Sequence, residues 1–332
     1  MRTAADARPA CRTTDATVVR ACAHALVLLL FFTAALAEPL RNGFDRAGAL
    51  VPVEEILQGG PPRDGIPAID NPAFVPAREA NWLRGEDGVL GIRLHGIAKA
   101  YPIRILNWHE VINDRFGAEA IAVTFCPLCG SGMAFQSRAG TRALRFGVCG
   151  LLYNSDVLLF DRETESLWSQ IRMQAVSGAL KGAHLAAVPV VHTTWADWRK
   201  RNPGTLVLTQ QTGHARDYER DPYEGYEKSA ELVFPVRFRA EGFHPKERVL
   251  GILLEGKAKA YPFVELAKGK AQFTDRVAGR EVRIRYSAEH RSAEALDANG
   301  LPLVSTTLFW FAWAAFHPET EIYRARGKPA GK

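Results

Sequence analysis

One 18-residue segment occurs twice in this chain of 332 residues. Residues 89–106, VLGIRLHGIAKAYPIRIL, return 160 positions later as VLGILLEGKAKAYPFVEL at residues 249–266, and 12 of the 18 positions are identical. Two copies predict either paired domains or one pseudo-symmetric unit, because a solenoid needs three or more repeats. The chain is therefore expected to use one structural pattern twice.

The similarity continues beyond this segment with a one-residue shift. Asp114-Arg115 matches Asp275-Arg276, and the apolar alternation of residues 121–125 matches that of residues 282–286. A further pattern, Phe-x-x-Glu-Thr-Glu, begins at Phe160 and again at Phe316, and we take these two stretches as a third matched pair.

Short runs of apolar residues predict the fold class. Residues 89–94 and 97–102 flank His95-Gly96 and are typical of a β-hairpin, and further short strands are expected at 121–125, 133–135, 144–148 and 156–160. One helix is marked by Thr194 with Asp197 three residues later, and Asn202-Pro203 ends it. Trp195 and Trp198 of this helix are expected to pack in the core, and residues 307–316 to form a buried element. The prediction is a mainly β (α+β) protein of two tandem repeats of short antiparallel strands and hairpins with a few helices.

Composition divides the chain into six parts. Pro and Gly are frequent before residue 80, and charges surround tyrosines after residue 209. The expected parts are a signal peptide (1–37), an extended N-terminal arm (38–84), repeat 1 with the CPLCG motif (85–208), a linker (209–245), a degenerate repeat 2 (246–323) and a tail (324–332).

The N-terminus has the pattern of an export signal. Four arginines precede an apolar stretch at residues 21–35, and Ala35-Leu36-Ala37 forms an A-x-A cleavage site. A retained membrane anchor is the alternative, but the stretch is short for a spanning helix. Cleavage predicts an extracytoplasmic protein, periplasmic or secreted, that keeps three cysteines in an oxidising compartment.

Charge and composition exclude several classes. The 42 Lys and Arg exceed the 36 Asp and Glu by only six, and no run concentrates them, so nucleic acid is not an expected partner. The apolar fraction of 47% with 23% charged residues is that of a folded globular chain rather than a disordered or multi-span membrane protein. After signal cleavage the protein is not expected to be integral to a membrane.

The sharpest chemical motif is Cys126-Pro127-Leu128-Cys129-Gly130, after the predicted strand 121–125. Two thiols at this spacing can share a metal ion or exchange a disulfide with a partner. Gly130-Ser131-Gly132 starts a helix poorly, so we expect a tight turn whose backbone N–H groups point at sulfur. A structural disulfide between Cys126 and Cys129, or two inert buried thiols, remains an alternative.

Other ligands must come from elsewhere in the chain. His109 is the first candidate, with Glu110 to orient its ring or act as a base, whereas Cys149 and Met133 are weaker candidates. In a thiol-dependent oxidoreductase, Cys126 would attack, Cys129 would resolve the mixed disulfide, and His109 with Glu110 would supply the base. In a metal site, Cys126, Cys129 and His109 would hold a zinc or copper ion.

The second copy lacks the two cysteines of this candidate site. Ser287 and His290 stand where Cys126 and Cys129 stand in the first copy, so we expect one site per chain. A redox partner or a metal-receiving protein would be the corresponding partner.

Two other classes remain open. The first is a non-catalytic cell-envelope module with a Cys126–Cys129 disulfide and a ligand groove between the copies, lined by Trp108, Trp168 and Tyr153. The second is an unrelated enzyme whose acid and base are carboxylates on strand ends, for which the candidates are Asp156, Asp161 and Glu163.

Four linked motifs, NWHEVIND, TFCPLCGSGMAF, LLYNSDVLLFDRETESLWSQ and HTTWADWRKRNPGTLVL, resemble the bacterial family called domain of unknown function 3179. The resemblance covers roughly residues 85–320. The family is uncharacterised, and it includes members labelled as selenoproteins. The resemblance therefore implies a strong nucleophile at the position of Cys126 or Cys129, which favours redox chemistry. Cys149 departs from the serine that the resemblance leads us to expect.

Overall fold

A computed structural model describes residues 42–325 of the chain. The expected signal peptide at residues 1–37 lies outside this range, as do the first residues of the arm and the last residues of the tail. Within the described range, no helix is both long and apolar enough to cross a membrane.

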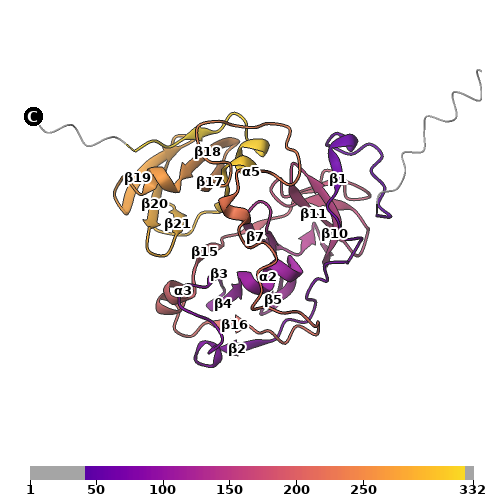
Figure 1. The fold of residues 1–332 in the computed structure, drawn as a ribbon, viewed down its shortest axis with the longest axis horizontal. Helices are drawn as coiled ribbons and strands as arrows, with labels where there is room; N and C mark the ends of the chain where they lie inside the picture. The colour runs from indigo at the N-terminus through magenta and orange to yellow at the C-terminus, as the bar shows by residue number, and fades with distance from the viewer. Residues whose placement is uncertain (1–41, 326–332) are drawn as a thin grey trace, which may run out of the picture. The chain divides into compact units, whose positions relative to one another are not determined.

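The described residues form a mainly β structure of small, mostly antiparallel sheets, as the sequence predicts. Five sheets of three to five strands are accompanied by a two-stranded hairpin of β8 (Arg138–Ala139) and β9 (Arg142–Ala143). The prediction of two tandem repeats needs correction, because the sheets have a propeller-like arrangement of five blades (Figure 1).

Two of the sheets share one strand order. In each, an antiparallel hairpin pairs with a later strand on one side and with a parallel strand on the other. The first sheet runs β15 (Val191–Thr194), β3 (Gly88–Leu94), β4 (Ile97–Pro102), β16 (Leu206–Leu208) and β2 (Phe74–Pro76). The second runs β22 (Thr306–Phe309), β17 (Arg248–Leu254), β18 (Lys257–Pro262) and β23 (Glu321–Ile322).

A tryptophan from a helix packs on a strand glycine in both sheets. Helix α3 (Trp195–Arg201) places Trp198 so close to Gly91 that a Cβ there would lie 2.2 Å from the ring. Helix α5 (Trp310–Phe316) places Trp313 in the same way on Gly251, at 2.3 Å. Only glycine fits under either ring.

The matched Phe-x-x-Glu-Thr-Glu stretches at Phe160 and Phe316 do not correspond in the structure. Trp198 donates its indole N–H to Thr205 Oγ1 at 2.9 Å, and Trp313 donates to Thr320 Oγ1 at 2.8 Å. Thr320 is therefore the counterpart of Thr205 rather than of Thr164. The correct match of residues 310–322 is with 195–207, because strand pairing, not a short shared motif, determines equivalence.

Two further sheets also correspond. One contains β14 (Ala187–Val188), β7 (Ser131–Gln136), β6 (Glu119–Cys126) and β5 (Val111–Phe116). The other contains β19 (Gln272–Val277), β20 (Arg280–Ser287) and β21 (Ser292–Leu296). A Lys–Tyr–Asp cluster ties each to its neighbouring hairpin: Lys99 and Tyr101 bind Asp114, and Lys259 and Tyr261 bind Asp275.

The fifth sheet has no counterpart in the second copy. It contains β1 (Ile56–Gln58), β10 (Phe146–Tyr153), β11 (Asp156–Asp161), β12 (Leu167–Ser169) and β13 (Gln174–Ser177). Strand β1 belongs to the predicted arm, so the arm completes this sheet. Sheets of the two copies also touch one another, β7 beside β22 and β15 beside β21. A simple tandem of separate repeats is therefore not formed.

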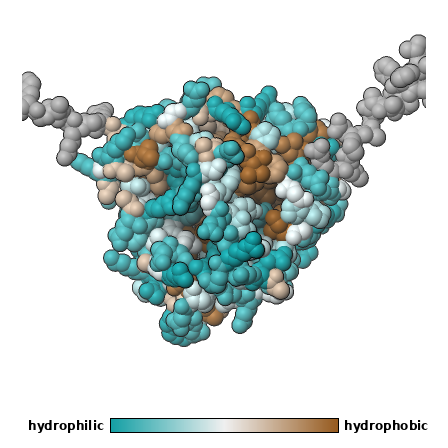
Figure 2. Space-filling view, viewed as in Figure 1, coloured by the Kyte–Doolittle hydropathy of each residue, from teal (hydrophilic) through white to brown (hydrophobic). Residues whose placement is uncertain are grey.

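The remaining helices are short. Helix α2 (Ile103–His109) follows the β3–β4 hairpin, where the sequence analysis expected no helix, and α4 (Phe263–Leu266) follows the β17–β18 hairpin. Single 3-10 turns occur at η1 (Val53–Glu55), η2 (Ala77–Glu79) and η3 (Tyr226–Lys228). Figure 2 shows that the face of the molecule in this view is mostly hydrophilic, with hydrophobic side chains gathered in a few compact areas.

Candidate functional site

Two turns from different sheets meet around the cysteine motif. The turn at residues 127–130 joins β6 to β7, and Asn154-Ser155 joins β10 to β11. The Ser155 carbonyl accepts hydrogen bonds from both thiols, at 3.3 Å from Cys129 Sγ and 3.8 Å from Cys126 Sγ. The turn is tight as expected, but among the described residues a backbone N–H donates to sulfur at Cys149, not at these two thiols.

Both turns have local sequence causes. Asn154 and Ser155 have φ of 51° and 64°, as a two-residue hairpin turn of type I′ requires. Gly130 has φ of 61°, and a Cβ on it would lie 3.0 Å from the Phe309 ring. Phe309 also donates its backbone N–H to the Cys129 carbonyl at 2.8 Å. Strand β22 of the second copy therefore supports the cysteine turn of the first.

A carboxylate completes the group. One potential ligand atom each of Cys126, Cys129 and Asp156 lies within 4.8 Å of the other two, and all three side chains are buried. Asp156 Oδ2 accepts the backbone N–H of Ile171 at 3.1 Å, whereas the buried Oδ1 has no hydrogen-bond partner among the described residues. The two sulfurs and the carboxylate therefore form one buried group, in which both thiols interact with Asp156.

Glu110 adds a second buried acid. It follows α2 in the left-handed conformation, with φ of 58°, and its backbone carbonyl accepts from Phe125 N–H. Burial and then the charge of Asp156 raise the pKa of Glu110 to about 8. Burial also raises the pKa of Asp156 to about 8, against the effect of the Ile171 N–H. Within residues 42–325, neither carboxyl forms an ion pair with a basic residue, so without a bound cation both favour the protonated form.

The thiols lie in the same environment. Cys126 is 1% exposed and Cys129 is fully buried. Burial, followed by interactions with Cys126 and Asp156, raises the pKa of the Cys129 thiol well above its ordinary value. Because thiolate is the nucleophile and the metal ligand, Cys129 is unreactive unless a cation stabilises its charge.

The linker contributes two tyrosines to the surroundings of the cluster. Burial raises the pKa of both phenols, and nearby acids add to the effect: Glu110 and Cys126 at Tyr223, Cys129 and Cys126 at Tyr226. The buried Tyr226 hydroxyl has no hydrogen-bond partner among the described residues. The Lys246 ammonium lies 3.6 Å from the centre of the Tyr226 ring. These side chains place the linker against the thiols.

A buried hydrogen-bond network holds the cysteine turn. Ser131 donates to Gln170 Oε1 at 2.6 Å, and Gln170 Nε2 donates to Thr124 Oγ1 at 2.8 Å. Thr124 in turn donates to the Met133 carbonyl. This network fixes β6 and β7 to the loop that supplies the Ile171 N–H, so the sulfurs and Asp156 share one rigid support.

The other sequence candidates lie outside the cluster. His109 is buried, with Nδ1 2.7 Å from the Pro67 carbonyl and Nε2 2.7 Å from Tyr218 Oη, and burial first of all lowers its pKa to about 4. Cys149 donates to the Leu158 carbonyl at 2.8 Å, and burial raises its thiol pKa to about 12. Met133 packs in the apolar core. The structure therefore brings Cys126 and Cys129 together with Asp156, whose charge also acts on Glu110, and without these three side chains.

The aromatic and acidic candidates have structural contacts. Trp168 is fully buried and donates to Asp161 Oδ2 at 2.8 Å, and Tyr153 packs on Phe316. Glu163 accepts the backbone N–H of Arg145. Trp108 donates to the Arg220 carbonyl at 3.2 Å, so it contacts the linker.

Two contributors were not recognised as part of the cysteine site from the sequence. The sequence suggests Asp156 only as the acid or base of an unrelated enzyme, and it places Tyr226 only in the linker at residues 209–245. The signal for Asp156 is the Asn-Ser-Asp turn between two apolar strands, which predicts a hairpin tip. Nothing local indicates that this tip meets the cysteine turn.

Comparison with known proteins identifies the family. Searches of curated proteins and of solved structures returned no match. The family described as Protein of unknown function (DUF3179) matches residues 63–320, a range that contains the cysteine turn, the Asp156 turn and both copies of the repeated segment. The chain belongs to the DUF3179 family.

Proposed function

We propose that this protein binds one zinc or copper(I) ion through Cys126, Cys129 and Asp156. The observation that carries the proposal is that two thiols and a carboxylate, all buried, have potential ligand atoms within 4.8 Å of one another. Thiolates and carboxylates are zinc ligands, and two thiolates also suit copper(I).

Charge balance supports a cation here. Two carboxyls and two thiols are gathered with no basic ion-pair partner among the described residues, an arrangement that is costly once any of them ionises. On binding, each sulfur and the Asp156 carboxyl would release its proton to solvent as its bond to the metal forms. The raised pKa of the Cys129 thiol is thus compatible with a metal ligand and unfavourable for a free nucleophile.

Burial disfavours the alternative of disulfide exchange with another protein. A partner's sulfur would have to approach Cys126 in line, but that side chain is 1% exposed. A structural Cys126–Cys129 disulfide is the other alternative, and both sulfurs are free in this conformation. Metal binding uses the cluster as it is folded, without moving the linker tyrosines.

Metal content tests the proposal. The full protein would be recovered without oxygen, and its native mass and metal content measured for the wild type, Cys126→Ser and Asp156→Asn. We expect about one metal ion per wild-type chain and loss of it in both variants. Ser287→Ala, at the matched position of the second copy, and Cys149→Ser, which removes the third described thiol, are controls that should keep the metal.

Cobalt(II) gives a second readout. The metal-free protein titrated with cobalt(II) should develop sulfur-to-metal charge-transfer absorption, and Cys126→Ser should weaken it. Equal metal in the wild type and Cys126→Ser would overturn the proposal. So would a metal-free wild type lighter by two hydrogens, which would establish a disulfide.

We also propose that the protein acts outside the cytoplasm. The support is the basic segment, apolar stretch and Ala-Leu-Ala site at residues 2–37. Fractionation of the producing cells, with N-terminal sequencing of the recovered protein, tests it. Cleavage after Ala37 is the expected result, and recovery of the uncleaved chain from the cytoplasm would contradict it.

We infer in addition that the two sequence copies form one pseudo-symmetric unit, to which the first copy adds the fifth sheet. The support is the common strand order of their sheets and the repeated Gly–Trp, Trp–Thr and Lys–Tyr–Asp contacts. Only one half carries the thiols. Separate expression of residues 246–323 tests this inference, because half of an interdependent unit should not fold alone.

A further inference from the structure

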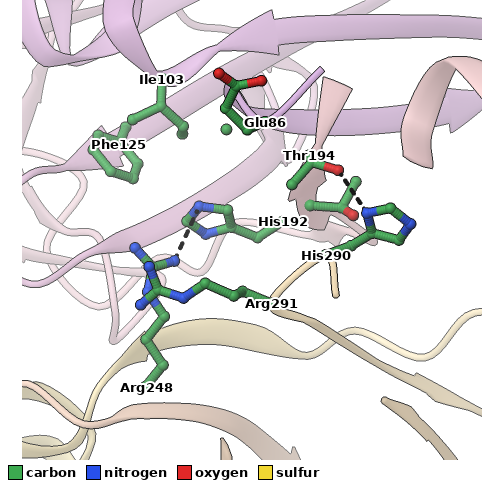
Figure 3. A pocket seen from close by; sticks show the side chains of 10 residues that line it. Glu86, Ile103, Phe125, His192, Thr194, Arg248, His290 and Arg291 are labelled. Atoms are coloured by element: carbon green, nitrogen blue, oxygen red, sulfur yellow. Dashed lines mark hydrogen bonds between the residues drawn. The ribbon is translucent and has the colours of Figure 1, made fainter. Parts of the chain in front are cut away.

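A second polar pocket lies between the two copies, apart from the thiol cluster. It has a volume of about 230 Å³ and is lined on one side by Arg248, His290 and Arg291 of the second copy. His192 and Thr194 of β15 line the other side (Figure 3). Nothing in the proposed metal site uses these residues.

The two arginines share one carboxylate. Glu227 accepts from Arg248 Nε at 3.1 Å and from Arg248 Nη2 at 3.3 Å, and it also accepts from Arg291 Nη2. Burial alone would raise the pKa of Glu227, but Arg248 and Arg291 outweigh it and lower the pKa to about 2. Glu227 is therefore ionised, and the three groups together carry a net charge of +1, which faces Glu86 across the pocket.

His192 adds a donor that lacks an acceptor. The side chain is 7% exposed, and its Nε2 lies 3.5 Å from Arg248 Nη1. Burial and the Arg248 charge lower the pKa of the ring to about 3, so the ring is neutral. Because Nε2 faces a donor, the proton belongs on Nδ1. Nδ1 is buried and has no hydrogen-bond partner among the described residues.

The rest of the pocket is partly apolar. Phe125 and Ile103 lie on one side of it, and Glu86 lies across the pocket from the two arginines (Figure 3). Phe125 also packs edge-on against the His192 ring, with centroids 6.2 Å apart. A ligand here would meet guanidinium groups at one end and an aromatic ring and an aliphatic side chain at the other.

We propose that this pocket binds a small monocarboxylate with an apolar body, its carboxylate against Arg248 and Arg291 and its body against Phe125 and Ile103. At this end of the pocket two positive charges face one negative charge, that of Glu227, so the arginines can accept a second carboxylate. Guanidinium groups bind carboxylates in planar, two-point geometry, and Glu227 already uses that geometry with Arg248. A dianion would bring two negative charges, rather than one, beside Glu227 and Glu86, so a monoanion is favoured.

Benzoate is a suitable probe, titrated calorimetrically into the full chain. Saturable binding is expected, and Arg291→Gln should weaken it about tenfold or more, since the variant loses a charge-assisted hydrogen bond to the carboxylate. The Arg291 side chain is 62% exposed, so its replacement should leave the fold intact. Arg280→Gln, which changes another exposed arginine of the same sheet, is the matched control and should bind as the wild type does.

Three results would overturn the proposal. They are an absence of saturable heat with benzoate, equal affinity in Arg291→Gln and the wild type, and stronger binding of inorganic phosphate than of benzoate. Benzylamine, which has a similar ring and the opposite charge, should not bind. Cys126→Ser should keep benzoate binding, so failure of the metal site and failure of this pocket are distinguishable.

Discussion

The turns after β6 and after β20 have the same place in two corresponding sheets but carry different chemistry. Cys126-Pro-Leu-Cys-Gly130 and Ser287-Ala-Glu-His-Arg291 each span the same number of residues, and each ends on a positive φ, at Gly130 and at Arg291. Each also contacts β15 or β22 of the other copy. The Cys129 carbonyl accepts from the Phe309 N–H, and His290 Nδ1 lies 3.0 Å from Thr194 Oγ1.

The difference shows which parts of the repeat are structural. The Gly–Trp contact, the Trp–Thr hydrogen bond and the Lys–Tyr–Asp cluster occur in both copies, so they serve the fold. Thiols occur at only one turn, and a histidine–arginine pair at the other. The turn is thus a position that the fold holds fixed while its side chains change. The following predictions test how equivalent the two copies are.

The largest effect is expected at the buried acid of the first copy. Lys99 and Asp114 are 9% and 6% exposed, whereas Lys259 and Asp275 are 13% and 23% exposed. Asp114→Ala leaves a buried ammonium without its partner and should lower the free energy of unfolding by about 3–5 kcal/mol. Asp275→Ala should cost about 1 kcal/mol. Urea denaturation measures both.

Asp114→Asn is the variant to measure if Asp114→Ala does not fold. It retains a hydrogen-bond acceptor for Lys99 and should lose less stability. Equal losses for Asp114→Asn and Asp275→Asn would mean that burial does not distinguish the two clusters.

Adding a methyl group at Gly91, under Trp198, or at Gly251, under Trp313, should reduce the stability of the protein by a similar amount. Gly91→Ala and Gly251→Ala place a Cβ 2.2 Å and 2.3 Å from an indole ring, so each should lower the free energy of unfolding by about 1–3 kcal/mol or more. Gly204→Ala is the control, because its Cβ would meet nothing within 4 Å. A loss confined to one of the two glycines, seen in urea denaturation, would break the equivalence.

The loss of folding stability at acidic pH should come in part from His109, which has no matching histidine in the second copy. Its folded-state pKa of about 4 lies below the ordinary 6.5, so the unfolded chain binds more protons between these values. Stability should therefore rise with pH across this window and fall on acidification. His109→Gln should reduce the loss between pH 6.5 and 4 by about 1–3 kcal/mol.

Urea denaturation at several pH values measures this slope. An unaltered slope in His109→Gln would assign the acid sensitivity to other groups.

The smallest effect is expected at the Trp–Thr hydrogen bonds. Thr205→Val and Thr320→Val each remove the acceptor of an indole N–H and should cost about 1 kcal/mol. Thr205 is 1% exposed and Thr320 is half-buried, so the loss should be larger at Thr205. Thermal unfolding of the two variants and the wild type checks the order, and a larger loss at Thr320 would contradict it.

Local signals predicted several elements of this fold from the sequence. The β3–β4 hairpin follows from alternation around His95-Gly96, and α3 begins at Thr194, whose hydroxyl accepts the Asp197 N–H as predicted. Residues 307–316 do form a buried element, part strand and part helix. Each of these depends on neighbours a few residues apart.

Long-range packing accounts for what the sequence did not predict. Asp156 meets the cysteine motif because two turns from different sheets converge, and no spacing in the chain records that convergence. His109 was a reasonable ligand candidate by residue type, but α2 directs it to Pro67 and Tyr218. The match of Phe160 with Phe316 was wrong because six residues of likeness do not determine strand pairing.

The single turn η3 connects the two candidate sites. Tyr226 stands beside the thiols, and the next residue, Glu227, binds Arg248 and Arg291. One peptide unit thus joins a side chain beside the thiols to the carboxylate that pairs with the arginines. If both proposed ligands bind and either one displaces η3, reciprocity requires that each would change the affinity for the other by the same factor.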